Sequence, residues 1–135
     1  MHLLIVILLL PILVWGIASD AMLYREILEG LFPHKKIIKV YVDDKNKAKV
    51  LQETGLFVQL VPHPDEADLL ILSEKRRIDT NKPIFAGTYR IMTLYPKRSI
   101  GGFYWKKGRP TLIFIQSSLQ RFHFRLPKKF EKYVE

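Results

Sequence analysis

The chain has 135 residues, a formal net charge of +9 and no cysteine. A chain of this length forms one domain and can bury a core without metals or disulfides. The absence of cysteine excludes a disulfide framework, a thiolate nucleophile and any zinc or iron–sulfur centre that needs cysteine ligands.

The N-terminus carries a strongly apolar stretch. Residues 3–14 are almost all Leu, Ile and Val, and small residues then recur two apart in Gly16-Ile17-Ala18 and Ser19-Asp20-Ala21. This pattern is typical of a secretory signal peptide, since about 16 apolar residues are fewer than the roughly 20 that span a bilayer. We therefore expect residues 1–21 to be a cleaved signal peptide and residues 22–135 to be one α/β domain in the periplasm. An uncleaved leader that anchors the protein in the inner membrane, or a buried strand of a cytosolic fold, are the alternatives.

The next part of the chain alternates between helical and strand patterns. Ser19 or Asp20 can cap a helix that ends between residues 30 and 33, and Asp43-Asp44 can cap a helix over residues 45–53. Continuous hydrophobic strands separated by helices predict a mostly parallel sheet that is covered on both faces. The predicted strands are 37–42, 56–61, 69–72 and 83–86, and a short helical turn is predicted at 90–95.

A β-hairpin is predicted near the C-terminus. The aromatic and β-branched runs 103–105 and 111–115 flank Lys106-Lys107-Gly108-Arg109, in which Gly108 can take a positive φ. Because strand side chains alternate, we expect Tyr104 to face opposite to Phe103 and Trp105. One helix then starts at Ser117 or Ser118 and another at Pro127. The predicted fold is an α/β three-layer sandwich in a single domain, with a mixed, mostly parallel sheet of five to six strands, a C-terminal antiparallel hairpin and terminal helices.

The last part of the chain resembles a known family. From Ile100 the order is Gly101-Gly102, an aromatic strand, a basic turn, an apolar strand, a Ser-Ser-Leu-Gln-Arg helix and Leu126-Pro127 before a final short helix. Over residues 100–135 this resembles the YfiR-like family of small exported bacterial proteins. The resemblance implies a non-catalytic periplasmic sensor or adaptor domain that binds a protein partner, such as the exported part of an inner-membrane signalling protein.

The positive charge is concentrated in the same part of the chain. From Lys97 onward there are ten basic residues against two acidic ones, whereas the preceding residues are nearly balanced. Basic residues interleaved with aromatic ones suit an anionic partner, and export argues against nucleic acid. We therefore expect a protein partner at the membrane or envelope to contact Trp105, Lys106, Lys107 and Arg109. The alternative is that these lysines form an ordinary solvated surface and the aromatic residues belong to the core.

The carboxyl ends of the predicted parallel strands are the place to look for a ligand site. Gly87, Thr88, Tyr89 and Arg90 follow one of these strands and could hold a small anion, as in one lobe of a periplasmic binding protein. Asp43-Asp44 and Ser73-Glu74 follow two other strands.

No catalytic set of residues can be assembled from these groups, so we expect a protein that is not an enzyme and has no cofactor or metal. Neither phosphate-binding glycine motif, G-x-G-x-x-G or G-x-x-x-x-G-K-[ST], occurs. His63 with Asp65, Glu66 and Asp68 could bind a cation, but carboxylates so closely spaced before a strand more often cap a helical turn.

Overall fold

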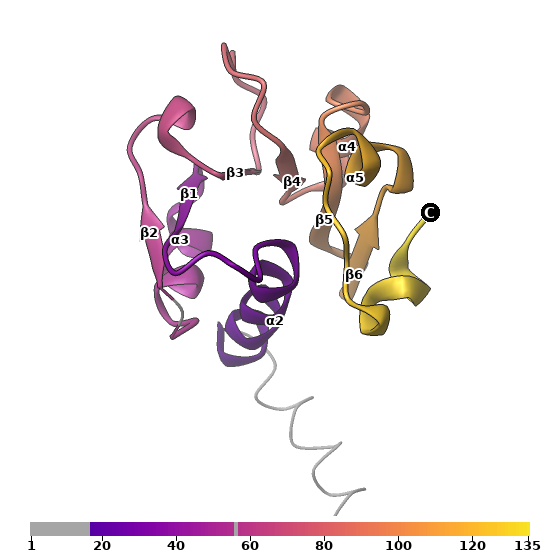
Figure 1. Ribbon diagram of the computed structural model, residues 1–135, viewed down its shortest axis with the longest axis horizontal. Helices are drawn as coiled ribbons and strands as arrows, with labels where there is room; N and C mark the ends of the chain where they lie inside the picture. Colours follow the sequence, from indigo (N-terminus) through magenta and orange to yellow (C-terminus); the bar gives the residue numbers. More distant parts are fainter. Residues whose placement is uncertain (1–16, 56) are drawn as a thin grey trace, which may run out of the picture.

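The structure is a computed structural model that describes residues 17–55 and 57–135 (Figure 1). Most of the predicted leader, residues 1–16, lies outside the described residues. Among the helices of the described part, none combines the length and the apolar character needed to cross a membrane. The helices are α2 (Ile17–Leu31), α3 (Lys45–Gln52), α4 (Tyr89–Leu94) and α5 (Gln116–Arg121), and the 3₁₀ turns are η1 (Pro64–Glu66) and η2 (Lys128–Tyr133). The strands are β1 (Ile38–Val42), β2 (Val58–Leu60), β3 (Leu69–Leu72), β4 (Ile84–Ala86), β5 (Ser99–Lys106) and β6 (Arg109–Phe114).

The strands form one six-stranded sheet in the order β2-β1-β3-β4-β5-β6. Figure 1 shows this order from β2 and β1 on the left to β5 and β6 on the right. All neighbouring pairs are parallel except β5 with β6. The predicted α/β class with a mixed, mostly parallel sheet is therefore confirmed. The predicted antiparallel hairpin is confirmed as the β5–β6 pair. On its other side β5 is parallel to β4, because the connection through α4 carries the chain back to the edge of the sheet where β4 begins.

Helices and loops cover both faces of the sheet and give the predicted three layers. On one face, α2 and α3 bury Ile27 and Leu51 against Phe85 and Phe114. On the other face, α4 inserts Ile91 against the apolar side chains of β3 and β4. β3 and β4 are buried at every position because each lies between two strands and beneath both layers.

The adjacent glycines of β5 permit a close approach of three strands. A Cβ added at Gly101 would lie 2.3 Å from the carbonyl oxygen of Ile113 on β6, and one at Gly102 would lie 2.9 Å from the carbonyl oxygen of Ala86 on β4. The register between β4 and β5 also shifts at this level. Only glycine fits both positions without moving a neighbouring backbone, which explains the Gly-Gly pair in physical terms.

Three predicted helix starts need correction. Ser19 and Asp20 lie inside α2, which already includes Ile17, so neither has the non-helical backbone of a cap. The predicted processing boundary after residue 21 thus falls within α2, and the cleavage itself stays a prediction. α5 begins at Gln116 instead of at a serine, and the last predicted helix is the 3₁₀ turn η2.

Candidate functional site

The tip of the β5–β6 hairpin extends beyond the rest of the sheet. β4 ends at Ala86, which pairs with Gly102, so the segment from Phe103 to Lys106 continues past it. Lys106 pairs with Arg109 across a two-residue turn, in which Lys107 and Gly108 have φ values of 51° and 75°. Positive φ at both positions is the geometry of a type I′ turn, which matches the twist of the paired strands.

One face of this tip contacts α4. The ring of Tyr104 lies edge-on to that of Tyr89, with 6.1 Å between the ring centres, and the Lys106 amino group lies 5.2 Å from the centre of the Tyr89 ring. Burial raises the pKa of the Tyr104 phenol, and the neighbouring Tyr89 and Glu135 add to the shift. The structure therefore brings together Tyr89 from the predicted anion site and Lys106 from the predicted partner site.

The other face of the tip contacts α2. The Phe103 ring packs edge-on against Tyr24 at 5.8 Å, and the Trp105 side chain hydrogen-bonds to Asp20. Burial raises the pKa of the Asp20 carboxyl, and this bond and the charge of Lys47 oppose the shift. The predicted alternation of Tyr104 against Phe103 and Trp105 is confirmed.

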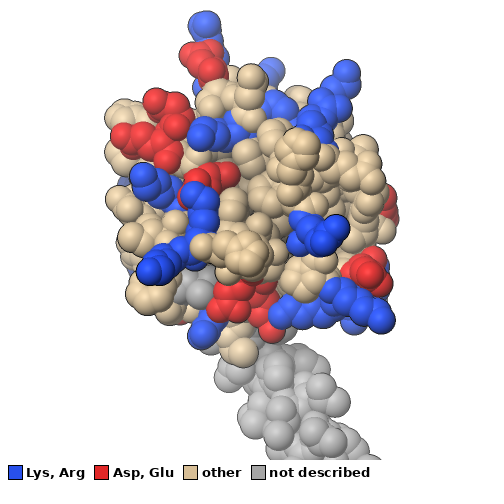
Figure 2. Space-filling model, in the orientation of Figure 1, with Lys and Arg blue, Asp and Glu red and all other residues tan. Residues whose placement is uncertain are grey.

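We refer to Tyr89, Trp105, Lys106, Lys107 and Arg109 together as the tip surface. Its two large aromatic members are well exposed, at 56% for Tyr89 and 47% for Trp105. Its charged members are exposed and all basic. On the face of the molecule shown in Figure 2, acidic and basic side chains are interspersed.

Two of the four residues in the predicted anion site are already engaged within the fold. The Gly87 N–H donates to the carbonyl of Leu72, and the Thr88 hydroxyl accepts from the Ile91 N–H and donates to the carbonyl of Ser73. Thr88 is therefore the cap of α4. Tyr89 and Arg90 remain exposed, and an anion bound by these residues stays a prediction.

The two adjacent aspartates after β1 have separate structural roles. Asp44 caps α3 by accepting from the Asn46 N–H, as predicted. Asp43 does not cap that helix. Its fully buried carboxylate accepts from the N–H groups of Ser73 and Glu74 at 2.8 and 3.0 Å and lies 3.8 Å from Arg76. Asp43 thus joins the end of β1 to the end of β3.

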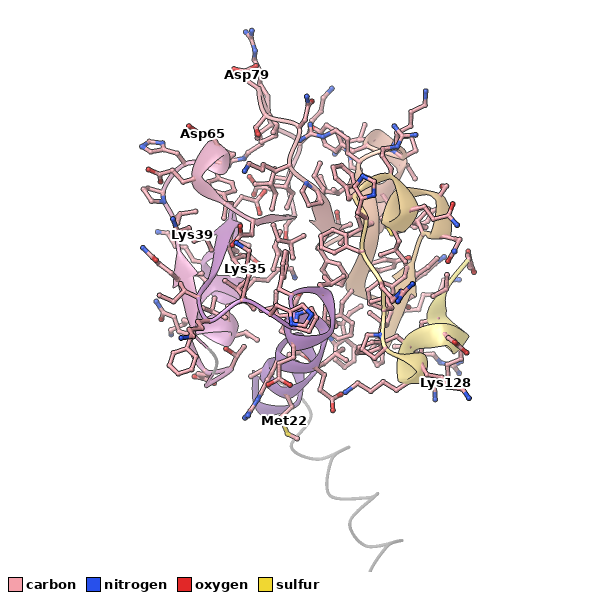
Figure 3. All side chains as sticks on the ribbon, viewed as in Figure 1. Met22, Lys35, Lys39, Asp65, Asp79 and Lys128 are labelled. Atoms are coloured by element: carbon pink, nitrogen blue, oxygen red, sulfur yellow. The ribbon has the colours of Figure 1, made fainter. Side chains whose placement is uncertain are left out.

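The acidic turn before β3 is also used structurally. The Asp68 carboxylate accepts from the Lys35 amino group and from the Lys39 N–H, both at 2.9 Å, so it ties the turn before β3 to the start of β1. Figure 3 labels Lys35 and Lys39 at this strand. His63 and Asp65 lie apart from it and line a surface hollow of ≈ 380 Å³. Within residues 17–55 and 57–135, no three metal-binding side chains come together.

A further group of polar side chains lies where β1, β3 and β4 end. Asp20 and Tyr24 come from α2, Lys47 from α3 and Ser73 from the end of β3, and we refer to these four residues as the edge cluster. Ser73 could be placed from the sequence, because it follows a buried strand. Asp20, Tyr24 and Lys47 could not, because only the tertiary packing of α2 and α3 brings them to this edge.

No family model matches the chain, and no curated protein sequence matches it. The resemblance of residues 100–135 to the YfiR-like family therefore stays a prediction. What the structure defines is an α/β domain with an exposed aromatic and basic hairpin tip.

Proposed function

We propose that this chain is a non-catalytic binding domain of the cell envelope, and that its tip surface holds an acidic region of a protein partner. The partner of the predicted type is the exported part of an inner-membrane signalling protein. The proposal depends chiefly on one observation, the contact between Lys106 and the Tyr89 ring, because it brings a residue of the predicted anion site against one of the predicted partner site at the hairpin tip. Trp105 flanks this pair from the opposite face of the hairpin.

The chemistry of the tip surface suits protein recognition. Trp, Tyr and Arg are the residue types that contribute most to binding at protein interfaces, and all three occur here. Lys106, Lys107 and Arg109 would attract an acidic surface over a distance and increase the rate of association. A two-residue turn has few backbone torsions to order, which limits the entropy that the tip loses on binding.

A capture experiment with matched variants tests this proposal. Full-length protein in mild detergent is incubated with an envelope fraction, the captured protein is identified, and its exported domain is purified for affinity measurements. We expect Trp105→Ala to weaken that complex at least tenfold, and Lys106→Glu to slow association and reduce its salt dependence.

Phe57→Ala is the matched control, because Phe57 is an aromatic residue that is 74% exposed and immediately precedes the opposite edge strand, β2. Its affinity should equal that of the wild type. A partner whose affinity is the same for the tip variants and the wild type would contradict the proposal, and so would failure to capture any envelope protein.

A further inference from the structure

The edge cluster contains buried polar atoms that the fold leaves without hydrogen-bond partners. These atoms are Oδ1 of Asp20, the hydroxyl of Tyr24 and Oγ of Ser73. Buried polar atoms are almost always hydrogen-bonded, because an unsatisfied one loses its interaction with water and gains nothing in return. Three such atoms from one cluster therefore need an explanation.

The members of the cluster come from elements that pack together, since α2 contacts α3, and Lys47 of α3 lies beside Ser73. Asp20 and Tyr24 are one helical turn apart on α2, and the pKa of Tyr24 is raised by burial and then by the charges of Asp20 and Asp44. Lys47 acts electrostatically on Asp20. A Cβ added at Gly87 would lie 2.4 Å from Ser73 Oγ and 2.5 Å from Lys47 Cε, so both of these side chains lie directly over Gly87.

The position of the cluster in the sheet is one where ligands commonly bind. From β1 the chain proceeds through α3 to β2 on one side, and β3 on the other side of β1 is followed outward by β4. In open α/β sheets, the carboxyl ends of the two strands at such a reversal of direction form the usual ligand site. Gly87, which has no side chain, permits Lys47 and Ser73 to come together there.

We propose that, in the chain that keeps its N-terminal segment, the edge cluster binds a small carboxylate that carries a hydrogen-bond donor on the adjacent carbon. The Lys47 ammonium provides a charge-assisted contact for the carboxylate, and Ser73 can donate to the same group. Asp20 Oδ1 is a free acceptor for the ligand's hydroxyl or ammonium group. The Tyr24 hydroxyl can bond either end of such a ligand. None of these four residues belongs to the predicted anion site at residues 87–90.

Trp105 provides a direct measurement of occupancy. Its side chain is hydrogen-bonded to Asp20, so a ligand at the Asp20 carboxyl changes the environment of the indole. The chain has two tryptophans, and Trp15→Phe leaves Trp105 as the single fluorescent reporter. The measurement needs no protein partner, so its result is independent of the function proposed for the tip surface.

The experiment titrates full-length Trp15→Phe protein with glycolate, glycine and acetate, up to about 10 mM, and follows Trp105 fluorescence and the heat of binding. Glycolate offers a hydroxyl beside the carboxylate, glycine offers an ammonium, and acetate offers neither. We expect saturable binding of glycolate or glycine and weaker binding of acetate, and the tighter ligand identifies the donor.

Two variants with a matched control locate the site. Tyr24→Phe removes one unpartnered hydroxyl and keeps the ring that packs against Phe85 and Phe103, so the protein should stay folded while affinity falls about fivefold. Lys47→Met should lower affinity at least tenfold, whereas Lys49→Met, at an exposed position on the same helix, should leave it unchanged. The proposal is overturned if neither glycolate nor glycine binds, if acetate binds as tightly as they do, or if Tyr24→Phe and Lys47→Met bind like the wild type.

Discussion

At the scale of single residues, Trp105 is partly an anchor and partly a contact group. It is 47% exposed, yet its side chain bonds to Asp20. We expect Trp105→Ala to lower the free energy of unfolding by about 1–2 kcal/mol, the value of one hydrogen bond plus partial burial. Phe114, which is completely buried, should cost about 3–5 kcal/mol when changed to Ala, and the exposed Phe57 should cost less than about 0.5 kcal/mol.

Urea denaturation of these variants provides the measurement. If Trp105→Ala proved as damaging as Phe114→Ala, Trp105 would be a core residue and the tip surface would lose its central aromatic group.

In the uncleaved chain, Asp20 should make stability depend on pH in an unusual direction for a carboxylate. Its pKa is raised, mainly by burial, so the folded protein holds this proton more tightly than the unfolded chain does. The stability that Asp20 contributes is therefore complete below the unfolded pKa of 3.8 and is lost as pH rises through the raised pKa. We expect Asp20→Asn to be more stable than the wild type near pH 7, with a difference that shrinks as the pH falls to about 4.

Paired denaturation curves at several pH values measure this difference directly, because the other titrating groups are common to both proteins. A difference that stayed constant across this range would show that burial does not disfavour the Asp20 charge.

At the scale of elements, the hairpin turn has one residue that suits its positive φ and one that is strained by it. Gly108 takes its positive φ without cost, but Lys107 does so as an ordinary L-residue. We expect Lys107→Asn to stabilise the protein by about 0.5–1 kcal/mol and Gly108→Ala to destabilise it by about 1 kcal/mol. Thermal unfolding of the two variants checks this, and equal midpoints for both would be inconsistent with a type I′ turn.

The positions of most elements could be predicted from local sequence alone. β3 and β4 are continuous apolar runs bounded by polar or turn residues, and α3 has both the Asp44 cap and Gly55, at φ 72°, just past its end. The role of Asp43 could not be predicted, because its partners are N–H groups some 30 residues away along the chain. The edge cluster could not be predicted either, because its members are also distant from one another along the chain. A cap is a local interaction, whereas strand order and the packing of α2 depend on contacts distant in sequence.

At the scale of the whole molecule, the layers should differ in how readily they open. β3 and β4 are fully buried, whereas the connection over residues 73–83 has no helix and projects at the top of the view, with Asp79 near its outer end (Figure 3). A few side-chain bonds fix this connection, including those from the Arg98 guanidinium to the carbonyls of Thr80 and Lys82.

Hydrogen exchange followed by mass spectrometry should therefore show the strongest protection at residues 69–72 and 84–86 and rapid exchange at residues 75–82. Equal protection of the two groups would mean that the connection is part of the stable core. Arg98→Ala should speed exchange in residues 80–82 without altering that of β3.

The outer edge of β6 constrains the way in which any partner can engage this end of the protein. Pro110 has no N–H, and the last residue of the chain closes the other end of the strand, since the Glu135 N–H donates to Phe114 and the Glu135 carbonyl accepts from Gln116. Little of the backbone is left to pair with an incoming extended peptide. A synthetic mimic of the partner would therefore have to reproduce acidic and ring-stacking side chains in the correct spatial arrangement, and an extended shape alone would not suffice.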